Sequence, residues 1–237
     1  MKDDNPDNCL FITGTGTGVG KTVVSSLLLG FLRAKGIKAG YQKWVSTGGD
    51  VPEDLLFCLR HNDMDFDEAK LDSQVVYRFR LPASPHLAAR VEGREIDAGE
   101  IKKAFYRCAA ENEVLVVEGV GGVLVPLRPD LLLADFLAGL RLPALVVSHS
   151  GLGAINHTLL TIEALRQRSI AVLGVVFSDE KEGMPLADPL VTDNMHTISR
   201  MGGVEVFGRL PRETDYGALR KAFQSMGDLI YRRFRAL

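Results

Sequence analysis

The chain has few cysteines, and those present follow no recognisable pattern. Cys9, Cys58 and Cys108 are odd in number, lie far apart and form no Cys-x-x-Cys pair. This distribution argues against a disulfide framework and against a cysteine zinc site, and it favours a reducing compartment.

Long apolar runs and a strong excess of charge are also missing. No apolar run approaches the length needed to cross a bilayer, and the polar segment 1–8 has neither the basic nor the apolar region of a signal peptide. The formal net charge is −2, which gives no reason to expect nucleic acid or an anionic membrane as a partner. We therefore expect a cytoplasmic protein in which 1–8 is a flexible N-terminal tail.

Internal repeats, low-complexity segments and dividing linkers are absent from the sequence as well. With 237 residues, 46% of them hydrophobic and 24% charged, the chain is globular in composition and long enough to bury a substantial core. We expect one domain over residues 9–237.

The sequence does contain an alternation of short apolar runs with helical patterns. Several apolar runs are continuous, as in strands that helices cover on both faces. The expected strands are 9–13, 39–43, 114–118, 144–148, 172–177 and 204–207, and the expected helices are 21–35, 53–62, 98–112, 131–138, 155–167, 190–201 and 216–233. This order predicts an α/β fold with a single-domain, doubly wound, mostly parallel sheet, whose functional loops gather at the carboxyl ends of the strands.

A glycine-rich segment between the first expected strand and helix is the most informative part of the chain. Residues 13–22 read Thr-Gly-Thr-Gly-Thr-Gly-Val-Gly-Lys-Thr, which are the parts of a phosphate-binding loop. Its backbone N–H groups and the helix N-terminus would face one anion, Lys21 would reach the β- and γ-phosphates, and Thr22 would bind Mg²⁺. The nucleotide-binding residues expected in this segment are Gly18, Val19, Gly20, Lys21, Thr22 and Val23.

The spacing of this loop departs from the usual one. Counting back from Gly20, Thr15 stands where the first glycine is normally found, and Gly14 lies one residue further out. The loop is therefore a longer variant. The alternative is a plain glycine-rich turn before a core helix.

Polar residues at two other strand ends are candidates for the same site. Lys43 stands where the second expected strand meets a Ser/Thr/Gly loop, and Glu118 ends the third before Gly119 and Gly121. An acid at such a strand end holds Mg²⁺ in P-loop enzymes, and a second cation suits a reaction that develops negative charge. The alternatives are a solvated lysine and a carboxylate that caps a glycine turn.

Four further segments have weaker signals. Asp54 lies at an expected helix start, where an acid also stabilises the first turn. Residues 151–157 follow a strand and begin a helix whose free N-terminus would bind a carboxylate. The alternative for His157 is a capped histidine of the first helical turn or a core histidine. Residues 82–86 form a stiff turn with two prolines, and 210–212, after the last strand, would line a nucleobase or form a turn.

Taken together, these segments resemble the dethiobiotin synthetase family, in order and over nearly the whole chain. The family has its own longer phosphate loop, which accounts for Thr15. The matching segments are 13–22, 43–48, 84–86, 117–122 with 126–127, and 152–161.

The resemblance implies an ATP- and Mg²⁺-dependent ligase of biotin biosynthesis. One amine of 7,8-diaminononanoate takes up CO₂ to give a carbamate, ATP phosphorylates the carbamate, and the second amine closes the ureido ring of dethiobiotin. Family members are homodimers with the diamine near the subunit interface. The catalytic residues would be Lys43, Lys21 and Thr17, and the metal ligands would be Thr22, Asp54 and Glu118.

The same resemblance implies the remaining binding residues. The substrate is expected to contact Thr47, Gly151, Leu152, Gly153, Ala154 and Asn156. Beyond the phosphate loop, the nucleotide is expected to contact Glu118, Gly119, Gly121, Ser178, Asp179, Leu210, Pro211 and Arg212.

Four positions depart from the family pattern. Gly16 replaces an Asp, Gly18 occupies a variable position, and Trp44 replaces a proline and is expected to add bulk beside the substrate. Ser178 stands where an Asn commonly reads adenine, and a serine cannot make the paired contacts of an amide. Relaxed use of other nucleoside triphosphates is therefore a hypothesis.

Alternative functions belong to the same structural class. One is a related P-loop synthetase acting on another amine or acid, such as a cobyrinate diamide synthase, although those usually carry a glutaminase domain with a reactive cysteine. Another is a partitioning-type ATPase switch, which has a second lysine at the position of Gly16. A GTPase needs an Asn-Lys-x-Asp reader, whereas 177–180 reads Phe-Ser-Asp-Glu.

Overall fold

The computed structural model describes residues 7–185 and 187–237. Most of the tail expected at 1–8 therefore lies outside the described residues. At the described end of this segment the Asn8 side chain donates to the carbonyls of Ala109 and Asn112, at 3.2 and 2.8 Å.

Within the described residues, one sheet of seven parallel strands has the order β3-β2-β4-β1-β7-β8-β9. Its strands are β1 Cys9–Gly14, β2 Ala39–Thr47, β3 Val75–Phe79, β4 Val114–Gly122, β7 Ala144–His149, β8 Val172–Glu182 and β9 Val206–Arg212. A small antiparallel pair consists of β5 Pro126–Arg128 and β6 Leu131–Leu132. The predicted doubly wound, mostly parallel sheet is confirmed.

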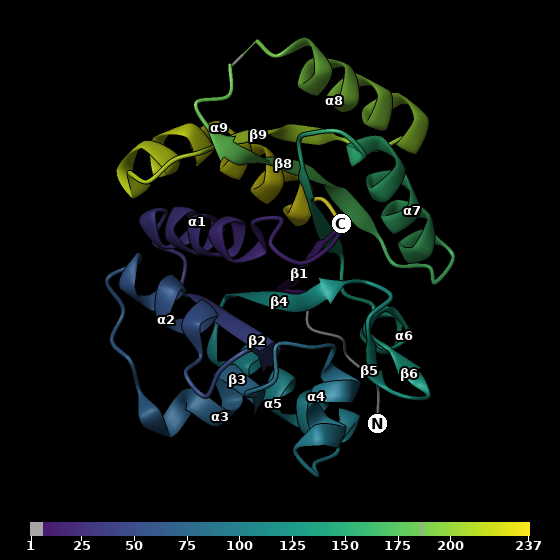
Figure 1. The fold of residues 1–237 in the computed structure, drawn as a ribbon. Coiled ribbons are helices and arrows are strands. Elements are labelled where there is room, and N and C mark those ends of the chain that lie inside the picture. The colour runs from purple at the N-terminus through teal and green to yellow at the C-terminus, as the bar shows by residue number, and fades with distance from the viewer. Residues whose placement is uncertain (1–6, 186) are drawn as a thin grey trace.

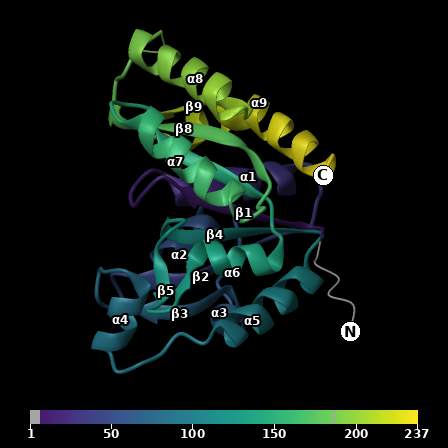
Figure 2. The same ribbon diagram turned by 90° about the vertical axis from the view of Figure 1, so that its right-hand side faces the viewer.

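Helices cover both faces of this sheet. One layer contains α1 Lys21–Ala34, α2 Glu53–Arg60 and α9 Tyr216–Arg235, and Figure 1 shows α1 between the other two. The opposite layer contains α4 Pro85–Val91, α5 Ala98–Glu111, α6 Leu133–Leu140, α7 Ala154–Arg166 and α8 Pro189–Gly202, with α6 and α7 facing the viewer in Figure 2. The short helices η1 Glu68–Lys70 and α3 Leu71–Gln74 precede β3. No helix among the described residues is long and apolar enough to cross a membrane.

The central strand explains why the apolar runs are continuous. In β1, Leu10 and Ile12 enter the core under α1, whereas Cys9 and Phe11 enter the opposite core. Successive side chains of a strand point to opposite faces, so a strand covered on both sides needs an apolar residue at every position.

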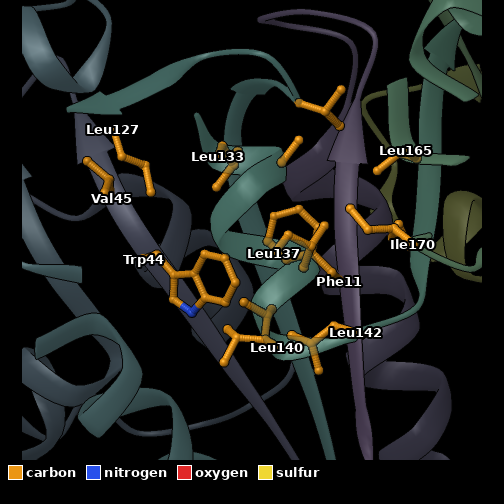
Figure 3. Packing of buried hydrophobic residues seen from close by; sticks show 14 of the residues in the cluster. Phe11, Trp44, Val45, Leu127, Leu133, Leu137, Leu140, Leu142, Leu165 and Ile170 are labelled. Atoms are coloured by element: carbon orange, nitrogen blue, oxygen red, sulfur yellow. The ribbon is translucent and has the colours of Figure 1, made fainter. Parts of the chain in front are cut away.

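Trp44 occupies a different place from the one expected. The prediction that Trp44 adds bulk beside the substrate is wrong, because its side chain is buried in the core and only 1% exposed. Its ring lies 5.0 Å from the rings of Phe11 and Phe136, and its indole N–H donates to Gln42. Figure 3 shows the indole directed into this core. Since Trp44 directly follows Lys43 in β2, the alternation of the strand places the two side chains on opposite faces.

Strand β3 was not predicted, and several elements begin or end at other residues than expected. Strand β3 is a short edge strand in which buried and half-buried positions alternate, so it has no continuous apolar run. The segment expected as a rigid turn at 82–86 enters α4, with Pro85 in the first turn of that helix. Residues 210–212 belong to β9 rather than following it. Helix α6 begins at Leu133, after β6, and not at 131.

We expect Trp44→Ala to lower the free energy of unfolding by about 3–5 kcal/mol, because it empties a large site in a closely packed core. Urea unfolding followed by circular dichroism measures this change. Trp44→Phe is the matched control and loses less, because a ring remains against Phe11. A Trp44→Ala loss below about 1 kcal/mol would contradict the core assignment.

Candidate active site

The candidate site lies at the carboxyl ends of β1, β2 and β4, where the loop after β1 leads into α1. Gly20 precedes the first helical residue with φ of +93°, and a Cβ there would lie 2.7 Å from Ser178 Oγ. A side chain is therefore excluded both by conformation and by space. Helix α1 begins at Lys21, as predicted.

A cavity of about 660 Å³ gathers most of the predicted catalytic and metal-binding residues. The predicted residues that line it are Thr17, Gly18, Gly20, Lys21, Thr22, Val23, Lys43, Thr47, Asp54, Glu118, Gly121 and Arg212. The other lining residues were not among the predicted site residues; they are Pro82, Ala83, Ser84, Pro85, Val120 and Val125. The segment 84–86 carried part of the family resemblance, so a signal for this wall was present.

Four residues from four elements meet at one end of this cavity. The Thr22 hydroxyl lies 2.7 Å from Asp54 Oδ1 and 2.9 Å from Glu118 Oε1. Lys43 Nζ donates to Glu118 Oε1 at 2.7 Å and forms an ion pair with Asp54. Lys43 and Glu118 are register partners on β2 and β4, so the sheet itself brings them together.

Tyr41 is a buried member of this cluster that sequence analysis missed. Its hydroxyl donates to Glu118 Oε2 at 2.9 Å, and its side chain is fully enclosed. Tyr41 lies two residues before Lys43 on β2, on the same face of the strand. That spacing is the signal that would have identified it.

Burial and charge act against each other at these groups. Burial lowers the pKa of Lys43, but attraction by Glu118 and Asp54 outweighs this effect and leaves the pKa raised. Burial raises the pKa of Asp54, but the Lys43 ammonium and the Thr22 hydroxyl bring it below its ordinary value. Both groups are therefore charged at neutral pH.

Lys21 is held differently from Lys43. Its Nζ donates to the carbonyl of Gly16, in its own loop, at 2.7 Å. Burial lowers its pKa to about 8, partly offset by attraction from Glu118. A phosphate at this loop would pair with the Lys21 ammonium and would favour its charged form.

The oxygen donors in the cavity fit a magnesium ion. Mg²⁺ is usually bound by one or two carboxylates together with phosphate oxygens and water, and the Thr22 hydroxyl with the Asp54 and Glu118 carboxylates supplies such a set. Among the described residues no group of three or more His, Cys, Asp or Glu is arranged to hold a metal. Phosphate oxygens or water would complete the coordination of such an ion.

A second cavity of about 260 Å³ adjoins the phosphate loop and shares Gly18, Gly20, Val23 and Arg212 with the first. The other predicted nucleotide-binding residues that line it are Val19, Ser178, Asp179 and Pro211. Its walls also include residues that were not predicted: His149, Phe57, His61 and Tyr216. The rings of His61 and Tyr216 stack with centroids 3.9 Å apart, which forms a flat surface suited to a nucleobase.

Three predicted nucleotide-binding residues make contacts with other parts of the fold. The Asp179 carboxylate accepts from Arg209 Nε at 2.7 and 3.0 Å and from the Ser150 hydroxyl at 2.5 Å. Leu210 is buried in the core beneath α9. Gly119 lies against Phe11, since a Cβ would approach that ring to 2.7 Å.

The segment predicted to bind the substrate carboxylate lines neither of the two cavities. In the described part of the chain, none of the predicted substrate residues at this helix start lines either cavity; they are Gly151, Leu152, Gly153, Ala154 and Asn156. Gly153, with φ of +91°, precedes α7, and Leu152 is 89% exposed. The structure of one chain therefore does not bring this segment to Lys43.

Comparison with known proteins identifies relatives of this architecture. The family model described as "AAA domain" matches residues 8–220. Among solved structures, the fold resembles the MinC:MinD cell division protein complex of Aquifex aeolicus, with a TM-score of 0.58, 16% identity and 95% of each chain covered. A ParA family ATPase from Chlorobium tepidum has a TM-score of 0.53 at 10% identity, with 98% of this chain and 100% of that one covered. At such identities these likenesses show the fold alone.

Curated proteins share much more of the sequence. ATP-dependent dethiobiotin synthetase BioD of Methanococcus vannielii is 38% identical over 207 residues, covering 87% of this chain and 95% of that protein. The protein of the same name from Anaeromyxobacter sp. strain K is 40% identical, with 93% and 96% covered. That of Chlorobaculum tepidum is 44% identical, with 71% and 72% covered. The chain therefore belongs to the ATP-dependent dethiobiotin synthetase family.

Proposed function

We propose that this chain is an ATP-dependent ligase that converts 7,8-diaminononanoate and CO₂ to dethiobiotin, with release of ADP and phosphate. The observation that carries the proposal is the convergence of Lys21, Lys43, Thr22, Asp54 and Glu118 in one cavity. Curated synthetases about 40% identical over nearly the whole chain support it. These findings do not require the alternative functions considered above, a partitioning-type ATPase switch or a related P-loop synthetase.

The phosphate loop and the cavity beside it would hold the nucleotide. Residues 18–23 would bind the triphosphate with their backbone N–H groups and with Lys21. The base would occupy the smaller cavity, against His61 and Tyr216. Thr22, Asp54 and Glu118 would hold Mg²⁺, which would supply positive charge on the phosphates of ATP.

Lys43 would act on the carbamate. One amine of the diamine adds to CO₂ and loses a proton, and an oxygen of the resulting carbamate attacks the γ-phosphorus, expelling ADP. Negative charge then lies on both the carbamate and the transferred phosphoryl group, and the buried Lys43 ammonium is suited to stabilise it. The hydroxyls of Thr17 and Thr47 line the same cavity and would orient these oxygens.

Ring closure completes the reaction. The second amine attacks the carbonyl carbon of the carbamic–phosphoric anhydride, forms the second C–N bond, and expels inorganic phosphate with loss of a proton. Water in the cavity would hydrolyse this anhydride. The wall formed by 82–85 beside Thr47 would limit the access of water to it.

We propose further that the active form is a homodimer. The segment 151–156, at the start of α7, lines neither cavity of its own chain, so a second copy is needed to bring it to a substrate at Lys43. Leu124, Leu152 and Leu160 are exposed large apolar residues on or near α7. Leu124 and Leu160 also line a shallow groove beside α7, and exposed apolar groups of this kind suit a self-complementary interface.

We expect Lys43→Ala to lower kcat about 10²–10³-fold, in the range found when a group that stabilises transition-state charge is removed. Dethiobiotin formed from the diamine, bicarbonate, Mg²⁺ and ATP is measured by mass spectrometry. Lys35→Ala is the control, since Lys35 is a partly exposed lysine paired with Asp228 away from the cavity. Wild-type turnover by Lys43→Ala would refute the role of Lys43, and ATP binding without any dethiobiotin from the wild type would point to another amine substrate.

We expect Leu160→Asp to convert the dimer to a monomer, because it buries a charge in an apolar interface. The KM for the diamine should rise at least about tenfold, while the affinity for ATP is retained. Light scattering after gel filtration gives the mass, and steady-state kinetics give the KM. Leu229→Asp, a similar change at an exposed leucine of α9, is the control. A wild-type chain that is monomeric and fully active would refute the dimer proposal.

We expect only modest discrimination among nucleoside triphosphates. Ser178 lies against Gly20 at the edge of the smaller cavity and lacks an amide for paired contacts with a base, whereas stacking on aromatic rings accepts any base. The kcat/KM values for ATP, CTP and GTP should therefore agree within about tenfold, and Ser178→Asn should raise the preference for ATP. A steep loss of rate with CTP and GTP in the wild type would refute the hypothesis.

A further inference from the structure

The Lys43 ammonium lies between the two carboxylates that the proposed function assigns to the metal. Nζ forms an ion pair with Asp54 and donates to Glu118 Oε1 at 2.7 Å. The Thr22 hydroxyl contacts the same two carboxylates. Lys43 and Glu118 are both buried, so these contacts are shielded from water.

Only one oxygen of Glu118 is directed at this space. Its Oε2 accepts from Tyr41 on the buried side of the carboxylate, whereas Oε1 faces Thr22 and Lys43. A metal ion that also uses Thr22 must therefore bind at Oε1. Mg²⁺ is bound directly by carboxylate oxygens, so at Oε1 it would take the oxygen to which the Lys43 ammonium now donates.

Two cations cannot share this position. Two positive charges at the same carboxylate oxygen repel strongly, and the repulsion increases where water is excluded. Lysine has a flexible four-carbon side chain, and Lys43 lines the open cavity beside Thr47. The side chain therefore has space to leave the carboxylates and enter the cavity.

We infer that the Lys43 ammonium and the divalent ion compete for the Asp54–Glu118 pair, so that binding of the metal–nucleotide complex releases Lys43 into the cavity. This inference rests on the proposed function for the identity of the metal ligands. Before release, the ammonium keeps the two carboxylates close together and oriented. After release, the ammonium would be free to pair with a γ-phosphate or a carbamate bound in the same cavity.

The two lysines of the cavity would then behave differently. Lys21 Nζ is bound to the neutral carbonyl of Gly16, so a metal ion does not take its partner away. Lys43 loses both of its carboxylate partners when the metal binds. Placement of the Lys43 charge on the substrate would therefore depend on prior binding of nucleotide and metal.

Binding of Mn²⁺ alone, without nucleotide, tests the competition. The free Mn²⁺ signal in electron paramagnetic resonance gives the Kd for the wild type, Lys43→Met and Lys21→Met at pH 8. Both variants remove one lysine from the same cavity, but only Lys43→Met frees the carboxylates. We expect Lys43→Met to bind Mn²⁺ at least about tenfold more tightly than the wild type, and Lys21→Met less than about threefold.

Equal or weaker Mn²⁺ binding by Lys43→Met, relative to Lys21→Met, would overturn the inference. Circular dichroism checks the fold of each variant, and Lys43→Gln replaces Lys43→Met if that variant does not fold. A parallel titration with ATP present separates the two levels of proposal. If neither the wild type nor the variants bind Mn²⁺ in the presence of ATP, the metal site of the proposed function fails together with this inference. If all of them bind Mn²⁺ but Lys43→Met binds it no more tightly than the wild type, only the competition is refuted.

Discussion

The structure of this site depends on one buried carboxylate, that of Glu118. A charged group at the end of a central strand, out of contact with water, is tolerated only when its oxygens are paired and hydrogen-bonded. Tyr41 satisfies one oxygen, and Thr22 and Lys43 satisfy the other. The positions of the two strands and of α1 are therefore linked to the position of a single side chain, and the cavity takes its shape from these contacts.

The parallel sheet is what makes this convergence possible. Every strand of the main sheet runs in the same direction, so residues far apart in sequence meet at one edge. Lys43 and Glu118 are 75 residues apart and still lie in register on neighbouring strands. The phosphate loop leaves β1 beside them, and α2 adds Asp54 from above the same edge. Lys21 and Lys43 thus line one cavity with the carboxylates of Asp54 and Glu118.

The same arrangement leaves part of the proposed substrate site incomplete within one chain. The helix start at 151–154 has glycines and backbone N–H groups that suit a carboxylate, but it does not line the cavity that holds Lys43. Ser150 and Asp179, tied together and to Arg209 and Asn194, fix the strand end that leads into this segment. A fixed segment outside the cavity of its own chain is consistent with the proposed homodimer.

Sequence alone was sufficient for the features that depend on local pattern. The phosphate loop, most of the strands and helices in their order, and the polar residues at the ends of β2 and β4 are visible along the chain, because strand, turn and helix have short-range signatures. Trp44 and Asp179 could not be placed in this way, since each depends on which face of a strand its side chain occupies and on what packs there. The sequence by itself determined that this chain binds nucleotide phosphates on a parallel sheet. Only the tertiary structure decided which cation holds Glu118 and that Trp44 belongs to the core, because both depend on contacts between segments that the chain keeps far apart.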